Sequence, residues 1–464
     1  MKIYNQKYKY VQKMDWHKLL LPIRYGDETP REHNSNANRS IFEQDYDRVI
    51  FSLPFRKLQD KTQVIPLPEN DFVHNRLTHS LEVSSVARTL GKSVGLALIK
   101  KYPNLHNNLN ISYNDIGAIV ATAALAHDIG NPPFGHSGEK AISDFFINGE
   151  GYYFKQFLTD VEFADLCNFE GNANGFKILT NDTDSNIGGL RLSYPVLASF
   201  TKYPKPNLPK INLKGVSNKK YGFFASEIEI YNDIAQKLAI EPKKESNCYF
   251  RHPLAFLVEA ADDICYSIID FEDGIRLGYI NFEYAEKLLK EIAGEKFFEK
   301  TYIGLKYIYQ KAAYLRAVAI SSLTEELSNI FMELEPNILE CSFDESLIKQ
   351  SRHYKIIEEI KSISYCNMYC NIQVLELETA GFKVLGSLLN NFTDVVKYKH
   401  EITFGSNTKN YRIEKIAQLI PDSFLNKSGN MYNQLLSVVQ YVAGLSDRNA
   451  INLYKKINGL SFTN

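Results

Sequence analysis

Apolar residues recur at intervals of three and four along most of this chain, and that spacing predicts a mainly helical fold. The small apolar run at 121–126 predicts a buried helix, and two adjacent polar residues, His127 and Asp128, follow it directly. Gly130 and the proline pair at 132–133 oppose further helix, so we expect both polar side chains to lie in the last turn and to open toward a loop. This position indicates either a hydrogen-bonded helix end or a functional site.

Two other segments carry polar residues at helical spacing. His79 lies in a segment with helical apolar spacing, and Arg76 lies one turn earlier on nearly the same face. Asp262, Tyr266 and Asp270 recur every four residues, so one helix face carries two carboxylates and a phenol. A solvated acidic face is the alternative for this last segment, but its neighbours are too apolar for a surface helix.

These residue types suit a divalent metal ion that acts on phosphate. Imidazole and carboxylate ligands from separate segments hold such an ion and leave positions open for water and substrate. The predicted ligands are His79, His127, Asp128 and either Asp262 or Asp263. His136 then remains for proton transfer, with Glu139 one turn away to orient or charge it, unless the two residues only hold each other for structure. Arg76 carries a planar cation that suits a phosphate oxygen.

Several segments resemble a known family. R-L-T-H-S-L-E-V at 76–83 and H-D-I-G-N-P-P-F-G-H-S-G-E at 127–139 are similar to motifs of the HD-domain deoxynucleoside triphosphate triphosphohydrolases, the dGTPase-like enzymes. Other segments resemble the family in the same order, namely F-R-K-L-Q-D-K-T-Q-V at 55–64, F-E-G-N-A-N-G-F at 169–176, T-K-Y-P at 201–204 and Y-V-A-G-L-S-D-R at 441–448. The resemblance covers residues 39–280 well and the remainder thinly.

The resemblance implies a helical HD-domain core and one divalent ion per subunit, Mn²⁺, Mg²⁺ or Fe²⁺. It selects Asp262 as the last ligand, because family members place a tyrosine four and an aspartate eight residues later, as Tyr266 and Asp270 stand here. The substrate-binding residues that it implies are Gln63, Val64, Arg76, Lys202, Tyr203, Tyr266 and Asp270. Gln63 and Val64 would line the sugar, with Val64 in the space of a ribose 2′-hydroxyl. Lys202 could equally be a solvated helix end.

The activity implied by the resemblance is metal-dependent hydrolysis of dGTP, and of other deoxynucleoside triphosphates, at the α-phosphorus, giving deoxynucleoside and inorganic tripolyphosphate. Two alternatives stay open: another HD phosphohydrolase that acts on other nucleotides, and a non-catalytic HD protein that binds nucleotide or single-stranded DNA. The intact ligand set and the His136–Glu139 pair favour an enzyme. The family forms homo-oligomers, hexamers among them, and some members bind single-stranded DNA or a regulatory nucleotide, so the resemblance admits these partners.

Composition narrows the class of protein. The 464 residues are 44% hydrophobic and 23% charged with a net charge of −1, as in ordinary soluble globular proteins. A nearly neutral chain needs local cations and a metal to bind a triphosphate. The six cysteines lack the paired spacing of a zinc or disulfide framework and indicate reduced thiols. With no apolar signal segment and no stretch near the roughly 20 apolar residues of a membrane span, we expect a cytoplasmic protein without membrane contact.

The pattern divides the chain into three parts. Residues 1–38 predict an irregular N-terminal segment, 39–280 the HD-type catalytic core, and 281–464 a helical region that completes the site and the oligomer contacts. The proline- and lysine-rich stretch 203–221 predicts an exposed loop, either for solubility or as a basic rim over phosphate or nucleic acid. The β-forming composition of 370–377 predicts a small ribbon within an otherwise mainly α fold.

Overall fold

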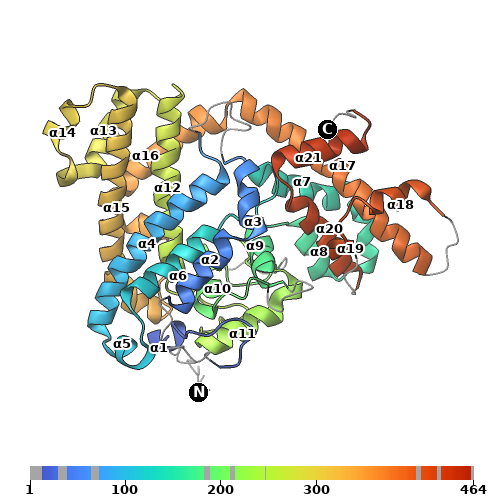
Figure 1. Ribbon diagram of the computed structural model, residues 1–464, viewed down its shortest axis with the longest axis horizontal. Helices are drawn as coiled ribbons and strands as arrows, with labels where there is room; N and C mark the ends of the chain where they lie inside the picture. The colour runs from blue at the N-terminus through green and yellow to red at the C-terminus, as the bar shows by residue number, and fades with distance from the viewer. Residues whose placement is uncertain are drawn as a thin grey trace, which may run out of the picture.

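The computed structural model describes residues 13–29, 39–63, 73–181, 189–208, 215–245, 247–403, 409–425 and 430–460. Helices dominate these residues, and their β structure is limited to isolated bridges such as that between Thr62 and Asn75 (Figure 1). The mainly α class predicted from the sequence is therefore confirmed. None of the described helices is long and apolar enough to cross a membrane.

The helices of the N-terminal half are α1 (Trp16–Leu19), α2 (Ile41–Ile50), α3 (Leu53–Arg56), η1 (Lys57–Asp60), α4 (Arg76–Lys101), α5 (Asn104–Leu109), α6 (Tyr113–Ala126), α7 (Gly135–Ile147), η2 (Glu150–Phe157), α8 (Asp160–Cys167), α9 (Gly171–Thr180), α10 (Tyr194–Phe200), η3 (Val216–Asn218), η4 (Ala225–Glu227) and α11 (Ile228–Leu238). Those that follow are α12 (Ala255–Arg276), α13 (Phe282–Ala293), η5 (Gly294–Lys296), α14 (Glu299–Ile303), α15 (Ile308–Leu339), η6 (Leu347–Gln350), α16 (Tyr354–Ser364), η7 (Tyr365–Tyr369, a π-helical turn), α17 (Ile372–Thr403), α18 (Tyr411–Ala417), α19 (Asp422–Leu425), α20 (Met431–Ala443) and α21 (Asp447–Ile457).

Two hydrophobic cores organise these helices. The first contains α4, α6, α12 and α15, and α15 lies at the left of Figure 1. The second contains α7, α17, α20 and α21, most of which lie at the right. The helices bury apolar side chains against one another, and α6 and α12 are buried on nearly all sides, because removing apolar surface from water is the main favourable term in packing. The link between α6 and α7 therefore passes from the first core to the second.

Local sequence explains where the helices that build the site begin. The Ser112 hydroxyl accepts a hydrogen bond from the Asp115 N–H at 3.3 Å, and the Asp115 carboxylate accepts one from the Ser112 N–H at 2.8 Å. This reciprocal cap satisfies two backbone donors at the start of α6. Asn75 caps α4 in the same way, by accepting a hydrogen bond from the Thr78 N–H at 3.0 Å. Both helices thus have fixed starting points, which set the positions of the polar residues that they carry.

The N-terminal segment contributes to the first core. Trp16 on α1 is buried, and its indole N–H donates to Glu335 on α15 at 2.8 Å. Part of the segment predicted to be irregular therefore packs against helices distant in the chain. Residues 1–12 and 30–38 lie outside the described residues.

Two predictions about loops are wrong. In the described part of 203–221, Tyr203, Lys205 and Tyr221 are buried rather than exposed, and the Tyr221 hydroxyl donates to the Asn168 carbonyl at 2.8 Å. The aromatic rings supply apolar surface that packs inward, which the proline and lysine content concealed. The stretch 370–377 contains the start of α17 and no ribbon, because its β-forming residues continue into a helix with its own buried face.

Candidate active site

The polar pair after α6 lies at the end of a buried helix, as the sequence predicted. Helix α6 ends at Ala126, His127 is the next residue, and Asp128 follows in a turn. Gly130 is not the helix stop, because the helix ends before it. An added Cβ at Gly130 would lie 2.1 Å from the Gly171 carbonyl oxygen, so this glycine instead allows α9 to approach the turn.

Side chains from α4, α12 and the end of α6 meet beside this turn. One nitrogen or oxygen atom each from His79, His127 and Asp262 all lie within 4.8 Å of one another, and we call these three residues the metal group. Asp262 Oδ1 is 3.3 Å from His79 Nε2 and 3.6 Å from His127 Nε2. His127 Nδ1 lies 2.7 Å from the Ala124 carbonyl oxygen, which places a proton on Nδ1 and leaves Nε2 as a ligand. Two imidazoles and a carboxylate placed in this way fit a divalent ion.

Electrostatics keep the site carboxylates ionised. Burial alone would raise the pKa of Asp262, but the charge of His127 and the contact with His79 lower it below its usual range. Burial would likewise raise the pKa of Asp128, but the charges of Arg76 and His127 outweigh burial and lower this pKa to about 2. Both groups are therefore anions at neutral pH and suit a cation.

Asp128 lies at the edge of the metal group. Its Oδ1 is 3.5 Å from His127 Nε2 and accepts a hydrogen bond from the Asn131 amide at 2.5 Å. Its Oδ2 accepts a hydrogen bond from Arg76 Nη1 at 2.8 Å. The ligand role of Asp128 stays a prediction, and its observed contact orients Arg76.

The two adjacent aspartates of α12 point to different partners. Asp262 belongs to the metal group, whereas Asp263 Oδ1 lies 3.8 Å from Lys361 Nζ on α16. Burial raises the pKa of Asp263 to about 6. The sequence alone left the choice open, and this placement agrees with the ligand that the resemblance implied.

His136 and Glu139 form a separate pair on α7. His136 Nδ1 is 2.7 Å from Glu139 Oε2, and Glu139 Oε1 accepts a hydrogen bond from the Gly171 N–H at 2.7 Å. Burial would raise the pKa of Glu139, but the hydrogen bond to His136 and the charge of Lys220 lower it. The His136 side chain is 75% exposed and lines a surface hollow of about 700 Å³. A buried carboxylate thus orients an imidazole that a substrate can reach.

Arg76 links the metal group to this pair. One terminal nitrogen of its guanidinium bonds Asp128, and an added Cβ on Gly135 would lie 2.7 Å from the other. Gly135 directly precedes His136, so the cation lies between the metal group and the start of α7. Such a forked cation suits a phosphate held between the two groups.

Lys202 and Tyr203 lie beside α12. Lys202 Nζ is 3.3 Å from Glu259 Oε1, one turn before Asp262, and 5.8 Å from the centre of the Tyr203 ring. Burial would lower the pKa of Lys202, but the charge of Glu259 outweighs burial and raises it. Lys202 is therefore a paired cation near the metal group and not a solvated helix end.

The two residues implied for the sugar are only partly described. Gln63 is half-buried, and its Oε1 is buried without a hydrogen-bond partner among the described residues. Val64 lies outside the described residues. The space for a ribose 2′-hydroxyl therefore stays a prediction.

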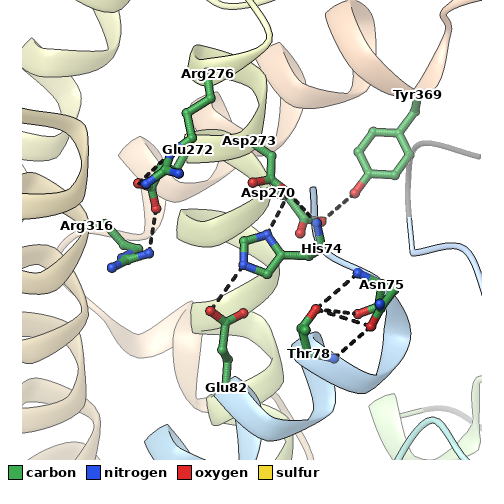
Figure 2. Close-up of polar contacts among 10 residues, drawn as sticks. All are labelled: His74, Asn75, Thr78, Glu82, Asp270, Glu272, Asp273, Arg276, Arg316 and Tyr369. Carbon is green, nitrogen blue, oxygen red and sulfur yellow. Dashed lines mark hydrogen bonds and ion pairs between the residues drawn. The ribbon is translucent and has the colours of Figure 1, made fainter. Parts of the chain in front are cut away.

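Figure 2 shows Asp270 and a tyrosine that the sequence did not identify. The Tyr369 hydroxyl donates to Asp270 Oδ2 at 2.8 Å, and the centre of its ring lies 6.0 Å from that of Tyr266. Burial raises the pKa of Asp270 to about 7. Tyr369 comes from η7, next to the stretch predicted as a ribbon, and no motif pointed to it.

His74 is a second residue that the sequence did not identify. Figure 2 shows its ring between Asp273, 2.7 Å from Nδ1, and Glu82, 3.2 Å from Nε2. Burial opposes the charged ring, but the two carboxylates raise the pKa of His74 to about 10. The imidazolium therefore joins α4 to α12 close to Asp270.

Comparison with known proteins identifies the family. The HD domain family matches residues 76–173. A deoxyguanosinetriphosphate triphosphohydrolase-like protein of Synechocystis is 39% identical over 97% of this chain and 100% of its own length. A protein of the same name from Pseudomonas aeruginosa is 35% identical over 97% of this chain and 99% of its own length. The deoxyguanosinetriphosphate triphosphohydrolase of Cronobacter sakazakii is 27% identical over 97% of this chain and 99% of its own length.

The helical fold, the metal group and the HD match together define an HD-domain hydrolase, a class that binds divalent metal. The relatives that align over nearly the full length narrow the class further. The chain belongs to the HD-domain deoxynucleoside triphosphate triphosphohydrolases, the dGTPase-like family. The family indicated by the sequence motifs is confirmed.

Proposed function

We propose that this protein hydrolyses deoxynucleoside triphosphates, dGTP among them, at the α-phosphorus and releases deoxynucleoside and inorganic tripolyphosphate. One observation carries the proposal: a group that can hold a divalent ion and an accessible His–Glu pair lie on either side of a buried arginine. The names of the relatives agree with this activity.

The ion would be held by His79, His127 and Asp262, with Asp128 as a fourth ligand. When bound, a divalent ion supplies a Lewis acid that polarises the α-phosphate. The two imidazoles suit Mn²⁺ or Fe²⁺, and the carboxylates admit Mg²⁺. The fixed Nδ1 proton of His127 keeps its Nε2 directed at this position.

The remaining residues act on the substrate directly. Arg76 and Lys202 offset the charge of the triphosphate, which the nearly neutral chain does not do by its overall field. A water oxygen bonds to the α-phosphorus, and the bond from that phosphorus to the 5′ oxygen breaks. His136 gives its proton to the 5′ oxygen and takes up the proton that the attacking water loses, and Glu139 holds the imidazole in place.

The primary product is expected to be tripolyphosphate, because cleavage at the 5′ oxygen leaves the three phosphates joined. Phosphorus NMR of a reaction in ¹⁸O-water measures this, and the label should appear in tripolyphosphate and not in the nucleoside. Each dNTP and GTP is tested singly and in pairs, with Mg²⁺ and with Mn²⁺. Pyrophosphate or orthophosphate as the first product would indicate another HD phosphohydrolase, and binding without turnover would indicate a nucleotide-binding protein.

Asp270 and Tyr369 are proposed to bind the sugar, beside Gln63 and Tyr266. Tyr369→Phe removes the hydroxyl that orients Asp270, and such a hydrogen bond is worth roughly 0.5–1.5 kcal/mol to a neutral group and roughly 1.5–3 kcal/mol to a charged one. We expect KM to rise about tenfold, with a smaller change in kcat, because about 1.4 kcal/mol corresponds to a factor of ten. Tyr309→Phe, at an exposed position near the start of α15, is the matched control. An unchanged KM for every deoxynucleotide would contradict the sugar assignment.

A further inference from the structure

Two segments that resemble the family, 55–64 and 441–448, meet at the turn between α6 and α7. Lys61 Nζ donates to the carbonyl oxygens of Asn131 and Ala443, the latter at 2.9 Å. Lys57 Nζ donates to the Gly444 carbonyl at 3.0 Å. Neither lysine is part of the site described above, and Lys61 is only 3% exposed. The buried Lys61 and the half-buried Lys57 thus bond backbone carbonyls and join the start of the catalytic core to the C-terminal helices.

Asp447 completes this junction. Its side chain is fully buried, and each carboxylate oxygen accepts one backbone hydrogen bond: Oδ2 from Thr62 at 2.9 Å and Oδ1 from Phe134 at 3.0 Å. A buried charge needs such partners, and hydrogen bonds to an ionised group are stronger than neutral ones. The first residue of α21 thus holds both the segment before α4 and the residue that starts α7.

Phe134 is the residue in this turn whose backbone needs to be held. Its φ is +64°, in the left-handed region, and it caps α7 without a side-chain hydrogen bond. A non-glycine residue there costs on the order of 1–3 kcal/mol and persists only where the surroundings determine it. Here they do, because Asp447 accepts its N–H, and its ring packs so closely on α17 that an added Cβ at Gly381 would lie 3.0 Å from it.

The two halves of the site therefore belong to different cores. His79 and Asp262 lie on helices of the first core, whereas His136 lies on α7, which packs against α17 in the second (Figure 1). The Asn131–Phe134 turn connects them, and His136 is two residues beyond Phe134. A shift of this turn would move the imidazole relative to the metal group without disturbing His79 or Asp262.

We propose that Asp447, supported by Lys61, is a positioning residue that fixes the Asn131–Phe134 turn and thereby sets the distance of His136 from the metal group. The inference rests on the proposed proton-transfer role of His136. It also gives the C-terminal helices a task in the reaction: they hold one half of the site although they lie outside the matched HD region.

Asp447→Asn tests this inference, because the amide keeps the shape but turns one acceptor into a donor that faces an N–H. We expect kcat to fall on the order of 10²-fold, the cost of a misplacement near 1 Å. Metal content and metal affinity should stay near wild type. In a His136→Ala background Asp447→Asn should cost little more, because it acts through His136. Asp422→Asn, at the exposed first residue of α19, makes the same charge change and should leave all of these values unchanged.

Hydrogen exchange at the backbone amides of Asn131, Phe134, Gly135 and His136 provides a readout that does not depend on the substrate. We expect these amides to exchange faster in Asp447→Asn than in the wild type. If Asp447→Asn does not fold, the same measurements on Lys61→Met test the inference. Wild-type kcat with unchanged exchange, loss of metal, or an equal loss of rate with and without His136 would each overturn the inference. A wild-type product other than tripolyphosphate would overturn the proposed function instead, and the exchange data would still test the positioning.

Discussion

Replacing His127 or Asp262 by alanine is expected to remove the divalent ion and nearly all turnover together. A bound ion contributes several kcal/mol to the transition state, and each 1.4 kcal/mol is a factor of ten, so the loss should be at least about 10³-fold. The fold should survive, because the two side chains are 16% and 34% exposed and neither is part of the hydrophobic core. Elemental analysis, turnover and thermal unfolding on the same purified samples measure these effects.

Two companion variants sharpen this test. His106→Ala removes an exposed imidazole on α5 and should change neither metal content nor rate. Asp128→Asn separates two roles: loss of the ion would make Asp128 a fourth ligand, and loss of rate with the ion retained would make it the group that orients Arg76. Full activity in a metal-free His127→Ala protein would contradict the metal group.

Features that depend on near neighbours in the chain could be predicted from the sequence. The cap at Ser112 and the buried helix that precedes the His127–Asp128 pair follow from local hydrogen bonds and spacing, although the helix ends at Ala126, earlier than expected. The shared face of Asp262 and Asp270 follows from helix periodicity alone. The motifs, once matched to a family, then indicated which polar residues meet, which spacing could not do.

Features that depend on distant contacts could not be predicted in this way. Tyr369 lies 99 residues from its partner Asp270, and Asp447 lies 313 residues from Phe134. Nothing in the local sequence of Tyr369 distinguishes it from a surface tyrosine, and the family-like segment around Asp447 does not indicate which distant residue it contacts. Gly130 was assigned to a helix stop because its close contact with α9 appears only when the chain is folded.

His136→Ala is expected to lower kcat by roughly 10²–10⁴-fold, the usual contribution of positioned proton transfer. Metal content and substrate affinity should be retained, because His136 lies on α7 outside the metal group. Glu139→Ala should also lose most of the rate, but less than His136→Ala, because Glu139 acts by holding the imidazole. The measurements are single-turnover rate, bound metal and substrate affinity.

The double variant separates this mechanism from a purely structural pair. If Glu139 works only through His136, removing both should cost little more than removing His136 alone, since residues that act as a unit are not additive. Glu139 also accepts the Gly171 N–H, so Glu139→Ala should lower the melting temperature, whereas Glu139→Gln keeps an acceptor for that N–H. A large loss of rate in Glu139→Gln with normal stability would show that Glu139 affects the rate by holding the His136 imidazole. Unchanged turnover in His136→Ala, or loss of metal from this variant, would contradict the proposal that His136 donates the proton.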